Sequence, residues 1–310
     1  MPELPEVQTI VDDLNKKIVG RKIVGVWFDA PKLIKKPKST EFEKKIKGLK
    51  IIEIKRRGKN ILIYLNSNLL LIHQKLTGHL LYGKWSFGKA QNKQKVIVES
   101  LIKGTLQEKV NNYIHLIFYL DNGWQLALSD LRKFAKILFG SKEKIEKLPD
   151  LTKLGPEPLN KNFTVDKFMS LMSFKKGKIK QVLMNQEIIA GIGNIYSDEI
   201  LWTAKINPFK SANQLKTKEL KAIYSAMKGI LKKAVKLRGT SISDYRDTAG
   251  KAGGYAEIKK VYQREGEPCQ RCKMPIKRVK IGGRSAHYCP KWQNCLIFFT
   301  APILIGSGKK

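Results

Sequence analysis

The first three residues of the chain combine two groups that can do covalent chemistry. Pro2 supplies a secondary amine when it is the first residue, and Glu3 places a carboxylate beside it. An α-amino group titrates near neutrality, so enough of it is unprotonated to attack an electrophilic carbon. The carboxylate can give and take protons at the same centre. Taken alone, Pro2 is better explained as an incidental second residue, and Pro5 with Glu6 as the opening of a helix.

All four cysteines of the chain lie close together, at Cys269, Cys272, Cys289 and Cys295. A C-x2-C pair followed after sixteen residues by another cysteine is the pattern of a zinc ribbon, in which two turns hold one tetrahedral ion. Trp292 stands where a second C-x2-C would have its cysteine, so we expect Cys295 as the fourth ligand and His287 as its substitute. Four protein ligands make such Zn2+, one per chain, structural. A hairpin held by packing alone, or with only three cysteines, is the alternative.

Residues 190–196 read AGIGNIY and connect two helical patterns. Two glycines let backbone amides point at an anion at the start of the second helix. The lysines nearby favour a phosphate over a small anion; they are Lys175, Lys176, Lys178 and Lys180. A simple packing turn between two helices explains the two glycines equally well.

The stretch DLRKF at 130–134 places Arg132 two residues before Phe134, directly after a predicted strand. In a loop over DNA, Phe134 can wedge into the base stack while Arg132 fills the vacated space. On this stretch alone, a core phenylalanine beside a solvated arginine is the better reading.

The charge of the chain is strongly positive. Its 310 residues include 60 Lys and Arg against 26 Asp and Glu, a net charge of +34. Such a field attracts polyanions and favours nucleic acid as the partner, although a lysine-rich surface can also serve solubility alone. The start is acidic and lacks the pattern of a signal peptide. The longest apolar stretch, 296–305, is about ten residues and too short to span a bilayer, so we expect no membrane contact.

Apolar residues recur at helical spacing over residues 3–18, which predicts an amphipathic helix ended near Gly20. Short β-rich runs then follow between 23 and 137, namely KIVGVWF, KIIEIK, NILIYL, NLLLIH, YIHLIFYL and WQLALS. Turn residues separate these runs, which predicts an antiparallel sheet domain arranged as a two-layered sandwich. The lysine-rich stretch 88–112 resembles an inserted loop.

The segment LGPEPL at 154–159 separates the sandwich from a second region. Residues 164–238 have helical patterns with breaks at 191–193 and 207–208, followed by a glycine-rich stretch and the cysteines. We therefore predict an α+β protein with an N-terminal helix on an antiparallel β-sandwich, a helical domain and a C-terminal zinc-ribbon hairpin. The predicted boundaries are 1–137, a linker at 138–160, 161–248, 249–300 and a tail at 301–310.

Seven motifs occur in one order along the chain: PELPEV, RGKN (57–60), LTGHL (76–80), LGPEPL, NQEIIAGIGNIYSDEIL (185–201), GTSISDY (239–245) and VYQREGEPCQRC (261–272). Together they resemble the bacterial formamidopyrimidine-DNA glycosylase family over about residues 2–295. PELPEV, rather than PEGPE, and the glycine-rich 248–255 resemble its oxidised-purine branch rather than the endonuclease VIII branch. The resemblance implies a helix–two-turn–helix DNA-binding domain at 161–248, followed by a lesion-capping segment and a zinc finger.

The resemblance implies a bifunctional enzyme, a DNA glycosylase and an abasic-site lyase. Met1 is removed in this family, and the exposed nitrogen of Pro2 attacks the sugar C1′ of the damaged nucleotide. Glu3 protonates the opening sugar ring and then shuttles protons. Lys59 corresponds to the lysine that contacts a flanking phosphate and assists β-elimination, and Arg284 to the finger arginine that assists δ-elimination.

The resemblance also implies the DNA contacts. Leu76, Arg132 and Phe134 correspond to the side chains that fill the hole left by the flipped nucleotide, and Arg132 would pair with the orphaned cytosine. Further DNA-contacting positions correspond to His73, in a loop facing the duplex, and to His115, Lys176 and Asn194. A satisfied core histidine is the alternative for His73 and His115. Leu76 stands where the family has methionine, and Lys133 and Ala135 replace its usual arginine and glycine.

The expected function is base-excision repair of oxidised purines, 8-oxoguanine and formamidopyrimidines, in double-stranded DNA. We expect a monomer with structural Zn2+, in the bacterial cytoplasm and associated with the nucleoid. Two alternatives stay open. One is the same scaffold acting on oxidised pyrimidines, and the other is a non-catalytic basic zinc protein that coats nucleic acid. The latter would be indifferent to Pro2→Gly or Glu3→Gln.

Overall fold

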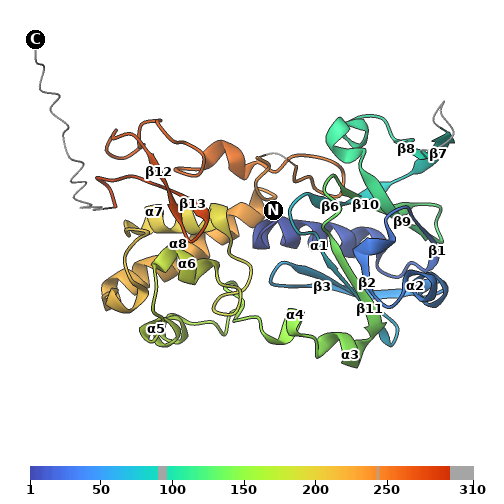
Figure 1. The fold of residues 1–310 in the computed structure, drawn as a ribbon, viewed down its shortest axis with the longest axis horizontal. Coiled ribbons are helices and arrows are strands. Elements are labelled where there is room, and N and C mark those ends of the chain that lie inside the picture. Colours follow the sequence, from blue (N-terminus) through green and yellow to red (C-terminus); the bar gives the residue numbers. More distant parts are fainter. Residues whose placement is uncertain (90–95, 243, 294–310) are drawn as a thin grey trace, which may run out of the picture.

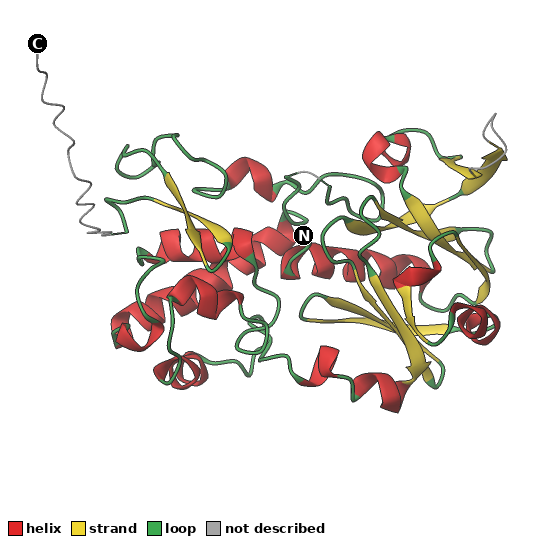
Figure 2. Ribbon diagram, in the orientation of Figure 1, coloured by secondary structure: helices red, strands yellow, loops and turns green. Residues whose placement is uncertain are grey.

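The computed structural model describes residues 1–89, 96–242 and 244–293, and these form a β-rich half and a helical half. The two halves lie side by side, and the N-terminus lies between them (Figure 1). Strands are confined to the first half and to a small hairpin at the edge of the second (Figure 2). This arrangement confirms the predicted α+β class. Within the described part of the chain, no helix is both long and apolar enough to cross a bilayer.

The β-rich half contains eleven described strands and four α-helices, interrupted by short 3-10 helices. In chain order its elements are α1 (Leu4–Ile18), β1 (Ile23–Phe28), η1 (Pro31–Leu33), β2 (Ile34–Lys36), α2 (Ser39–Ile46), β3 (Ile51–Arg57), β4 (Asn60–Leu65), β5 (Asn68–His73), β6 (Gly78–Gly83), β7 (Trp85–Lys89), β8 (Val96–Ser100), η2 (Thr105–Gln107), η3 (Lys109–Asn111), β9 (Ile114–Leu120), β10 (Gln125–Asp130), β11 (Lys136–Ser141), α3 (Lys142–Glu146) and α4 (Pro149–Thr152).

The helical half follows after a short extended segment. Its elements are α5 (Val165–Ser173), α6 (Ile179–Met184), α7 (Asn194–Ala204), η4 (Ala212–Gln214), α8 (Thr217–Lys236), η5 (Tyr255–Ile258) and the hairpin of β12 (Lys277–Ile281) and β13 (Arg284–Tyr288). The predicted breaks near 191–193 and 207–208 are confirmed. A further break at 174–178, which contains Gly177 with a φ of +100°, was not predicted.

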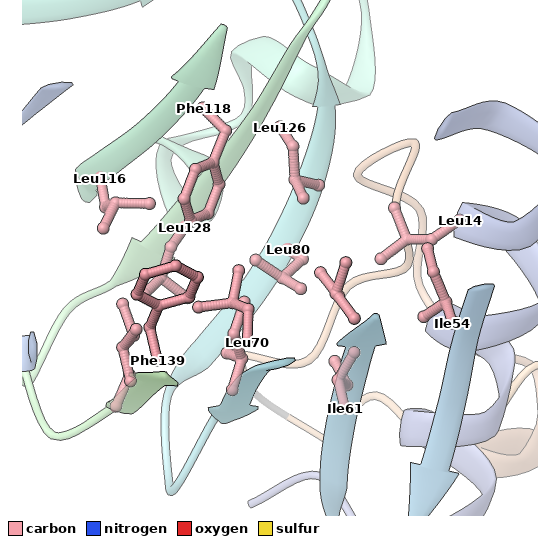
Figure 3. Close-up of a cluster of buried hydrophobic side chains, with 14 of the residues drawn as sticks. Leu14, Ile54, Ile61, Leu70, Leu80, Leu116, Phe118, Leu126, Leu128 and Phe139 are labelled. Atoms are coloured by element: carbon pink, nitrogen blue, oxygen red, sulfur yellow. The ribbon is translucent and has the colours of Figure 1, made fainter. Parts of the chain in front are cut away.

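The β-rich half is a sandwich of two sheets, as predicted. One sheet has the order β1-β9-β10-β6 and the other β2-β11-β5-β4-β3. The strand registers place leucines of β6, β9 and β10 in one row, and isoleucines of β4, β5 and β11 in another. Because alternate residues of a strand face one side, each sheet presents apolar side chains to the other. Figure 3 shows Leu80 and Leu128 of one sheet facing Ile61 and Leu70 of the other, with Leu14 of α1 beside them.

Helix α1 joins the two halves. Its apolar residues recur at helical spacing and are all buried, namely Leu4, Val7, Ile10, Val11, Leu14 and Ile18. The helix contacts β3 of the sandwich on one side and α8 on the other. Its first turn is closed by Glu6, whose Oε2 accepts a hydrogen bond from the Glu3 backbone nitrogen at 2.8 Å. The helix therefore fixes the amino-terminal residues at the junction between the halves.

The β-rich half differs from the predictions in three respects. The stretch 88–112 is not simply a loop, because it contributes to the β7–β8 hairpin and contains η2 and η3. Strands β6 and β11 were not predicted, since β6 is only six residues long and bounded by glycines, and β11 follows β10 after one tight turn. The proposed linker at 138–160 is also partly regular, because β11 ends within it and α3 and α4 follow.

Candidate active site

Residues of the amino terminus line a cavity of about 420 Å³ at the junction of the two halves. Several segments that are distant in sequence bring polar groups to it. Its lining includes Met1, Glu3, Lys59, Leu76, Asn194 and Arg284. Three of the four predicted catalytic residues, Glu3, Lys59 and Arg284, thus line one cavity, and Pro2 is buried between Met1 and Glu3.

The Glu3 carboxylate is held at the N-terminus of α7. It accepts hydrogen bonds from the backbone nitrogens of Gly193 at 2.7 Å, Ile195 at 2.8 Å and Tyr196 at 3.4 Å. The partial positive charge of a helix N-terminus stabilises such an anion. The prediction that these amides bind a phosphate is therefore wrong, because Glu3 of the chain itself occupies them. The AGIGNIY stretch acts in the site by fixing a carboxylate.

Gly193 allows the carboxylate and Lys59 to approach this backbone together. A Cβ on Gly193 would lie 2.6 Å from Glu3 Oε1 and 2.8 Å from Lys59 Nζ, closer than Cβ atoms approach other atoms. The glycine is required here for space, since its φ of −134° is open to any residue. Glu3 and the Lys59 ammonium therefore face the same small volume.

Burial weakens the protonation of amines in this cavity. Burial lowers the pKa of the Lys59 amine; Glu3 and Glu6 oppose this effect, and Arg284 adds to it. Burial likewise lowers the pKa of the amino-terminal nitrogen at Met1, again opposed by the two glutamates. Desolvation disfavours the charged form of an amine, so amines placed here are more available as bases or nucleophiles than amines in water.

Glu6 is a functional candidate that sequence reasoning treated only as part of a helix start. Its carboxyl is buried and accepts hydrogen bonds from the Tyr196 hydroxyl at 2.5 Å and the Thr240 backbone nitrogen at 2.7 Å. Burial first, and the charge of Glu3 second, raise the pKa of Glu6 to about 7. Its spacing of three residues from Glu3, typical of a capping box, was the available signal.

Leu76, Arg132 and Phe134 come from two adjacent loops. Phe134 is 50% exposed, and the guanidinium carbon of Arg132 lies 4.5 Å from the centre of its ring. The alternative of a core phenylalanine is therefore wrong. Asp130 organises both loops: its Oδ2 accepts from the backbone nitrogens of Phe134 and Ala135, each at 2.7 Å. Asp130 was quoted in the sequence motif but given no role.

Thr77, next to Leu76, links the first of these loops to the second. Its hydroxyl donates to Asp130 Oδ1 at 2.5 Å, and its oxygen accepts from the Arg132 backbone nitrogen at 3.2 Å. The three predicted hole-filling side chains are thus held on one connected framework.

Other predicted DNA contacts lie outside the cavity lining. His73 ends strand β5 instead of lying in a loop, and its Nδ1 accepts from the Lys75 backbone nitrogen at 2.9 Å. Burial, with Lys75 and Lys59, lowers the pKa of His73 to about 3, so this ring is neutral. His115 lies on β9 with its Nδ1 2.8 Å from Asp29 Oδ1. Lys176 is exposed in the 174–178 connection.

A buried polar cluster ties the finger hairpin to the helical half. Lys180, assigned above to a phosphate-attracting group, is fully buried, and its Nζ lies 2.5 Å from Asp198 Oδ1. Asp198 Oδ2 accepts from the His287 backbone nitrogen at 2.9 Å and lies 3.1 Å from its Nδ1. His287 is therefore engaged by Asp198 and is not part of the described cysteine cluster. This cluster anchors β13, which begins with Arg284.

Three of the four predicted metal ligands are brought together by the finger. The sulfurs of Cys269, Cys272 and Cys289 all lie within 4.8 Å of one another, and none of these three forms a disulfide. Two of these three cysteines, Cys269 and Cys289, are fully buried. A cluster of thiolates of this kind suits Zn2+, which cysteines bind in tetrahedral geometry. The fourth predicted ligand, Cys295, lies outside the described residues.

Trp292, at the position of the missing cysteine, packs beside the three cysteines. Its backbone nitrogen lies 3.2 Å from Cys289 Sγ, and its indole nitrogen donates to the Trp202 carbonyl at 3.2 Å. The Arg271 guanidinium lies 4.0 Å from the Trp202 ring centre and 4.4 Å from that of Trp292. These contacts stabilise the turn that contains Cys289 and Trp292, in addition to any stabilisation by a bound metal.

Comparisons with known proteins agree with this geometry. Residues 1–137 match the family model "Formamidopyrimidine-DNA glycosylase N-terminal domain", 154–246 match "Formamidopyrimidine-DNA glycosylase H2TH domain", and 266–291 match "Zinc finger found in FPG and IleRS". The finger match agrees with the zinc ligation expected of the three cysteines.

The chain is 38% identical over 294 residues to formamidopyrimidine-DNA glycosylase of Pelotomaculum thermopropionicum, covering 94% of this chain and 99% of that protein. The Desulforamulus reducens enzyme of that name is 35% identical, with the same coverage. The structure resembles that of a point mutant of Lactococcus lactis FPG in complex with Fapy-dG DNA, with a TM-score of 0.81, 32% identity, and coverage of 94% and 99%. The L. lactis Fpg complex with abasic-site DNA matches with a TM-score of 0.79, 32% identity and the same coverage. The chain therefore belongs to the formamidopyrimidine-DNA glycosylase family.

Proposed function

We propose that this protein is a DNA glycosylase and abasic-site lyase that removes oxidised purines from double-stranded DNA. The observation that carries the proposal is the cavity in which Glu3, Lys59 and Arg284 meet at the amino terminus. The relatives named above supply the substrate class, since their names and complexes refer to formamidopyrimidine and abasic sites.

The proposed nucleophile is the nitrogen of Pro2 after removal of Met1. This nitrogen attacks C1′ of the damaged nucleotide, the bond from C1′ to the base breaks, and the base leaves with the electron pair and takes a proton. The Glu3 carboxylate takes the proton that the Pro2 nitrogen loses and passes it to the sugar ring oxygen, and ring opening leaves an iminium between Pro2 and C1′. Burial lowers the pKa of the Met1 amino group, and Pro2 is buried beside it. The same desolvation would favour the unprotonated, nucleophilic form of the Pro2 nitrogen once Met1 is removed, which supports the proposal.

The iminium then acts as an electron sink for two eliminations. Loss of a C2′ proton expels the 3′ phosphate, and loss of the C4′ proton expels the 5′ phosphate. Lys59 and Arg284 are the proposed partners of the flanking phosphates, Lys59 assisting the first elimination and Arg284 the second. An arginine can grip a phosphate with two parallel hydrogen bonds. Zn2+ supplies no chemistry in this scheme and would hold the finger that carries Arg284.

Damaged nucleotides must leave the duplex to reach this cavity. Leu76, Arg132 and Phe134 are proposed to fill the space that the nucleotide vacates, and Arg132 to pair with the opposite cytosine. The exposure of Arg132 and Phe134, and the shared framework that holds all three side chains, support this role. Asn194, which lines the cavity, and exposed Lys176 are proposed as phosphate contacts. His73 and His115 are weaker candidates, because both rings already have partners.

Borohydride trapping tests the proposal. Protein whose first residue is shown by mass spectrometry to be Pro2 is incubated with a duplex carrying one 8-oxoguanine opposite cytosine. Wild type should give a covalent adduct, and Pro2→Gly and Glu3→Gln should give little or none. Absence of an adduct with wild type, on this lesion and on a formamidopyrimidine, would refute the oxidised-purine assignment.

A duplex with an oxidised pyrimidine is the second substrate of choice. One matched L. lactis Fpg structure, with a TM-score of 0.80, contains oxidised-pyrimidine DNA. A wild-type adduct with this duplex alone would assign the site to oxidised pyrimidines. Trapping with none of the three duplexes, with tight DNA binding retained, would leave a non-catalytic DNA-binding protein.

A further inference from the structure

One side of the active-site cavity is formed by the described residues of the connection between α8 and η5, namely 240–242 and 244–254, here called the wall loop. Thr240, Ile242, Asp244 and Tyr245 of this loop line the cavity. The two ends of the wall loop are joined, because the Tyr255 backbone nitrogen donates to the Gly239 carbonyl at 3.0 Å and Gly254 pairs with Thr240 as an isolated β-bridge. The part of the loop between these ends must be positioned by other contacts.

The far end of the wall loop is a tight bend built on Asp247. Its Oδ1 accepts from the backbone nitrogens of Ala249 and Lys251, each at 2.9 Å, and its carbonyl accepts from Gly250 at 3.0 Å. Gly250 has a φ of +79°, which favours glycine. Asp247 is itself paired with Arg238, with Oδ2 2.7 Å from Nη2. The bend is therefore a compact unit that presents its carbonyls outward.

Three consecutive carbonyls of this bend accept hydrogen bonds from the β-rich half. The Tyr82 backbone nitrogen donates to Thr248 at 2.8 Å, the Thr105 hydroxyl to Ala249 at 2.7 Å, and the Asn111 amide nitrogen to Gly250 at 3.4 Å. Thr105 and Asn111 belong to η2 and η3, in the stretch for which sequence analysis found no role.

Asn111 is held in place by contacts within the β-rich half as well as by the wall loop. Its side chain is fully buried, its amide nitrogen also donates to the Thr105 carbonyl at 2.6 Å, and its amide oxygen lies 2.9 Å from His79 Nε2. The contact with the bend is close, because a Cβ on Gly250 would lie 2.8 Å from the Asn111 amide nitrogen. Contacts within the β-rich half thus hold Asn111 in the position from which it contacts the bend.

We propose that Thr105 and Asn111 are positioning residues that hold the wall loop in place before a damaged base enters, an inference that rests on the proposed glycosylase function. Ordering the backbone costs conformational entropy, so a loop that only the bound base could order would weaken recognition of that base. An abasic site has no base to be enclosed. The wall loop therefore matters for base excision and not for strand cleavage at an abasic site.

Thr105 permits an isosteric test. Thr105→Val removes the hydroxyl that reaches Ala249, and Thr105→Ser keeps it. We expect Thr105→Val to lower the single-turnover rate of 8-oxoguanine excision about 2- to 10-fold, the equivalent of one neutral hydrogen bond. Cleavage of a preformed abasic site should keep its rate, and Thr105→Ser should excise like wild type. Thr152→Val, which removes an exposed hydroxyl on α4, is the matched control.

Hydrogen exchange of the wall-loop amides provides a readout without DNA. Exchange in 244–254 should accelerate in Thr105→Val and return to the wild-type rate in Thr105→Ser. Equal losses on both DNA substrates, or unchanged exchange, would overturn the proposed role. A wild type that cleaves the abasic site but excises no purine would refute the oxidised-purine function, and the exchange result would still decide whether Thr105 holds the loop.

Discussion

At the scale of single residues, the site depends on one backbone position where nothing larger than glycine fits. Gly193 supplies an amide to Glu3, and the space above its Cα is shared by the Glu3 carboxylate and the Lys59 amine. Neither group can withdraw at low cost, because the carboxylate is held by further amides of α7 and Lys59 is buried. The acidic Glu3 and the basic Lys59 are thus both held in the lining of one cavity, and among the described residues they do not form an ion pair with each other.

Gly193→Ala should therefore abolish most of the chemistry and spare DNA binding. The added methyl group displaces the Glu3 carboxylate, and loss of a positioned acid or base costs about 10²- to 10⁴-fold in rate. Single-turnover excision and equilibrium DNA binding are the measurements. Gly229→Ala on α8 is the matched control, since a Cβ there meets no atom within 4 Å. Equal activity of the two variants would contradict the tight packing inferred at Gly193.

Glu6 should make the stability of the protein depend on pH in a defined window. Its pKa is raised from 4.5 to about 7 by burial and by Glu3, so the folded state keeps this proton where the unfolded state has lost it. The resulting stabilisation is complete below pH 4.5 and is lost as the pH rises to about 7, a change of about 3 kcal/mol.

Urea unfolding of wild type and Glu6→Gln at steps between pH 4.5 and 7.5 measures this change. The free energy of unfolding of the variant should fall less over that range than that of wild type. Glu43→Gln, which alters an exposed carboxyl on α2, should follow wild type. Parallel curves for wild type and Glu6→Gln would show that Glu6 titrates normally.

At the scale of elements, the loop between β10 and β11 takes its shape from one buried carboxylate. Asp130→Asn places an amide nitrogen or a weaker acceptor opposite the backbone nitrogens of Phe134 and Ala135. Hydrogen bonds to charged groups contribute about 1.5–3 kcal/mol each, so the loop should lose its conformation. We expect the preference for excision opposite cytosine over adenine to shrink, while exposed Asp121→Asn leaves it intact. Unchanged opposite-base preference would exclude a positioning role for Asp130.

The finger is a second element that positions a side chain, Arg284, and we expect its structure to depend on bound Zn2+. Purified protein should contain about one Zn2+ per chain, and chelation should alter tryptophan fluorescence, because Trp202 and Trp292 pack against the cysteines. Cys269→Ser should lose the metal. If Cys295 is the fourth ligand, Cys295→Ser should weaken zinc affinity at least about 10-fold. Full zinc retention in Cys295→Ser would show that the three described cysteines suffice without it.

The elements and the site differ in how well sequence predicts them. Helix α1 and most strands were predictable because burial imposes a local period on their residues, and the finger was predictable because its cysteines have the spacing of metal ligands. The partner of the AGIGNIY amides was not, since Glu3 lies about 190 positions away and no local pattern connects them. Lys180 illustrates the same limit. It follows three lysines that are not buried, so it is read as a surface residue until Asp198 is seen opposite it.

At the scale of the whole molecule, two halves close around one cavity, and contacts across the junction fix its shape. Arg238, after α8, is bound to Asp13 of α1 and to Asp247 of the wall loop. Lys17 of α1 donates to Thr248 Oγ1 at 2.7 Å. The amino terminus, the wall loop and the helical half therefore form one connected unit, onto which a DNA duplex would dock across the junction.

The net charge of +34 should dominate the affinity of the protein for DNA. Each phosphate that the protein neutralises releases counterions, so the logarithm of the binding constant should fall linearly with that of salt concentration. For about six to ten phosphate contacts we expect a slope of about −5 to −9, measured by fluorescence anisotropy on an undamaged duplex. Lys176→Ala should reduce the magnitude of the slope by about 1, and Lys44→Ala, on α2 in the other half, should not. An equal change of the slope in both variants would mean that both lysines act only through the overall charge of the protein. The 174–178 connection would then make no phosphate contact of its own.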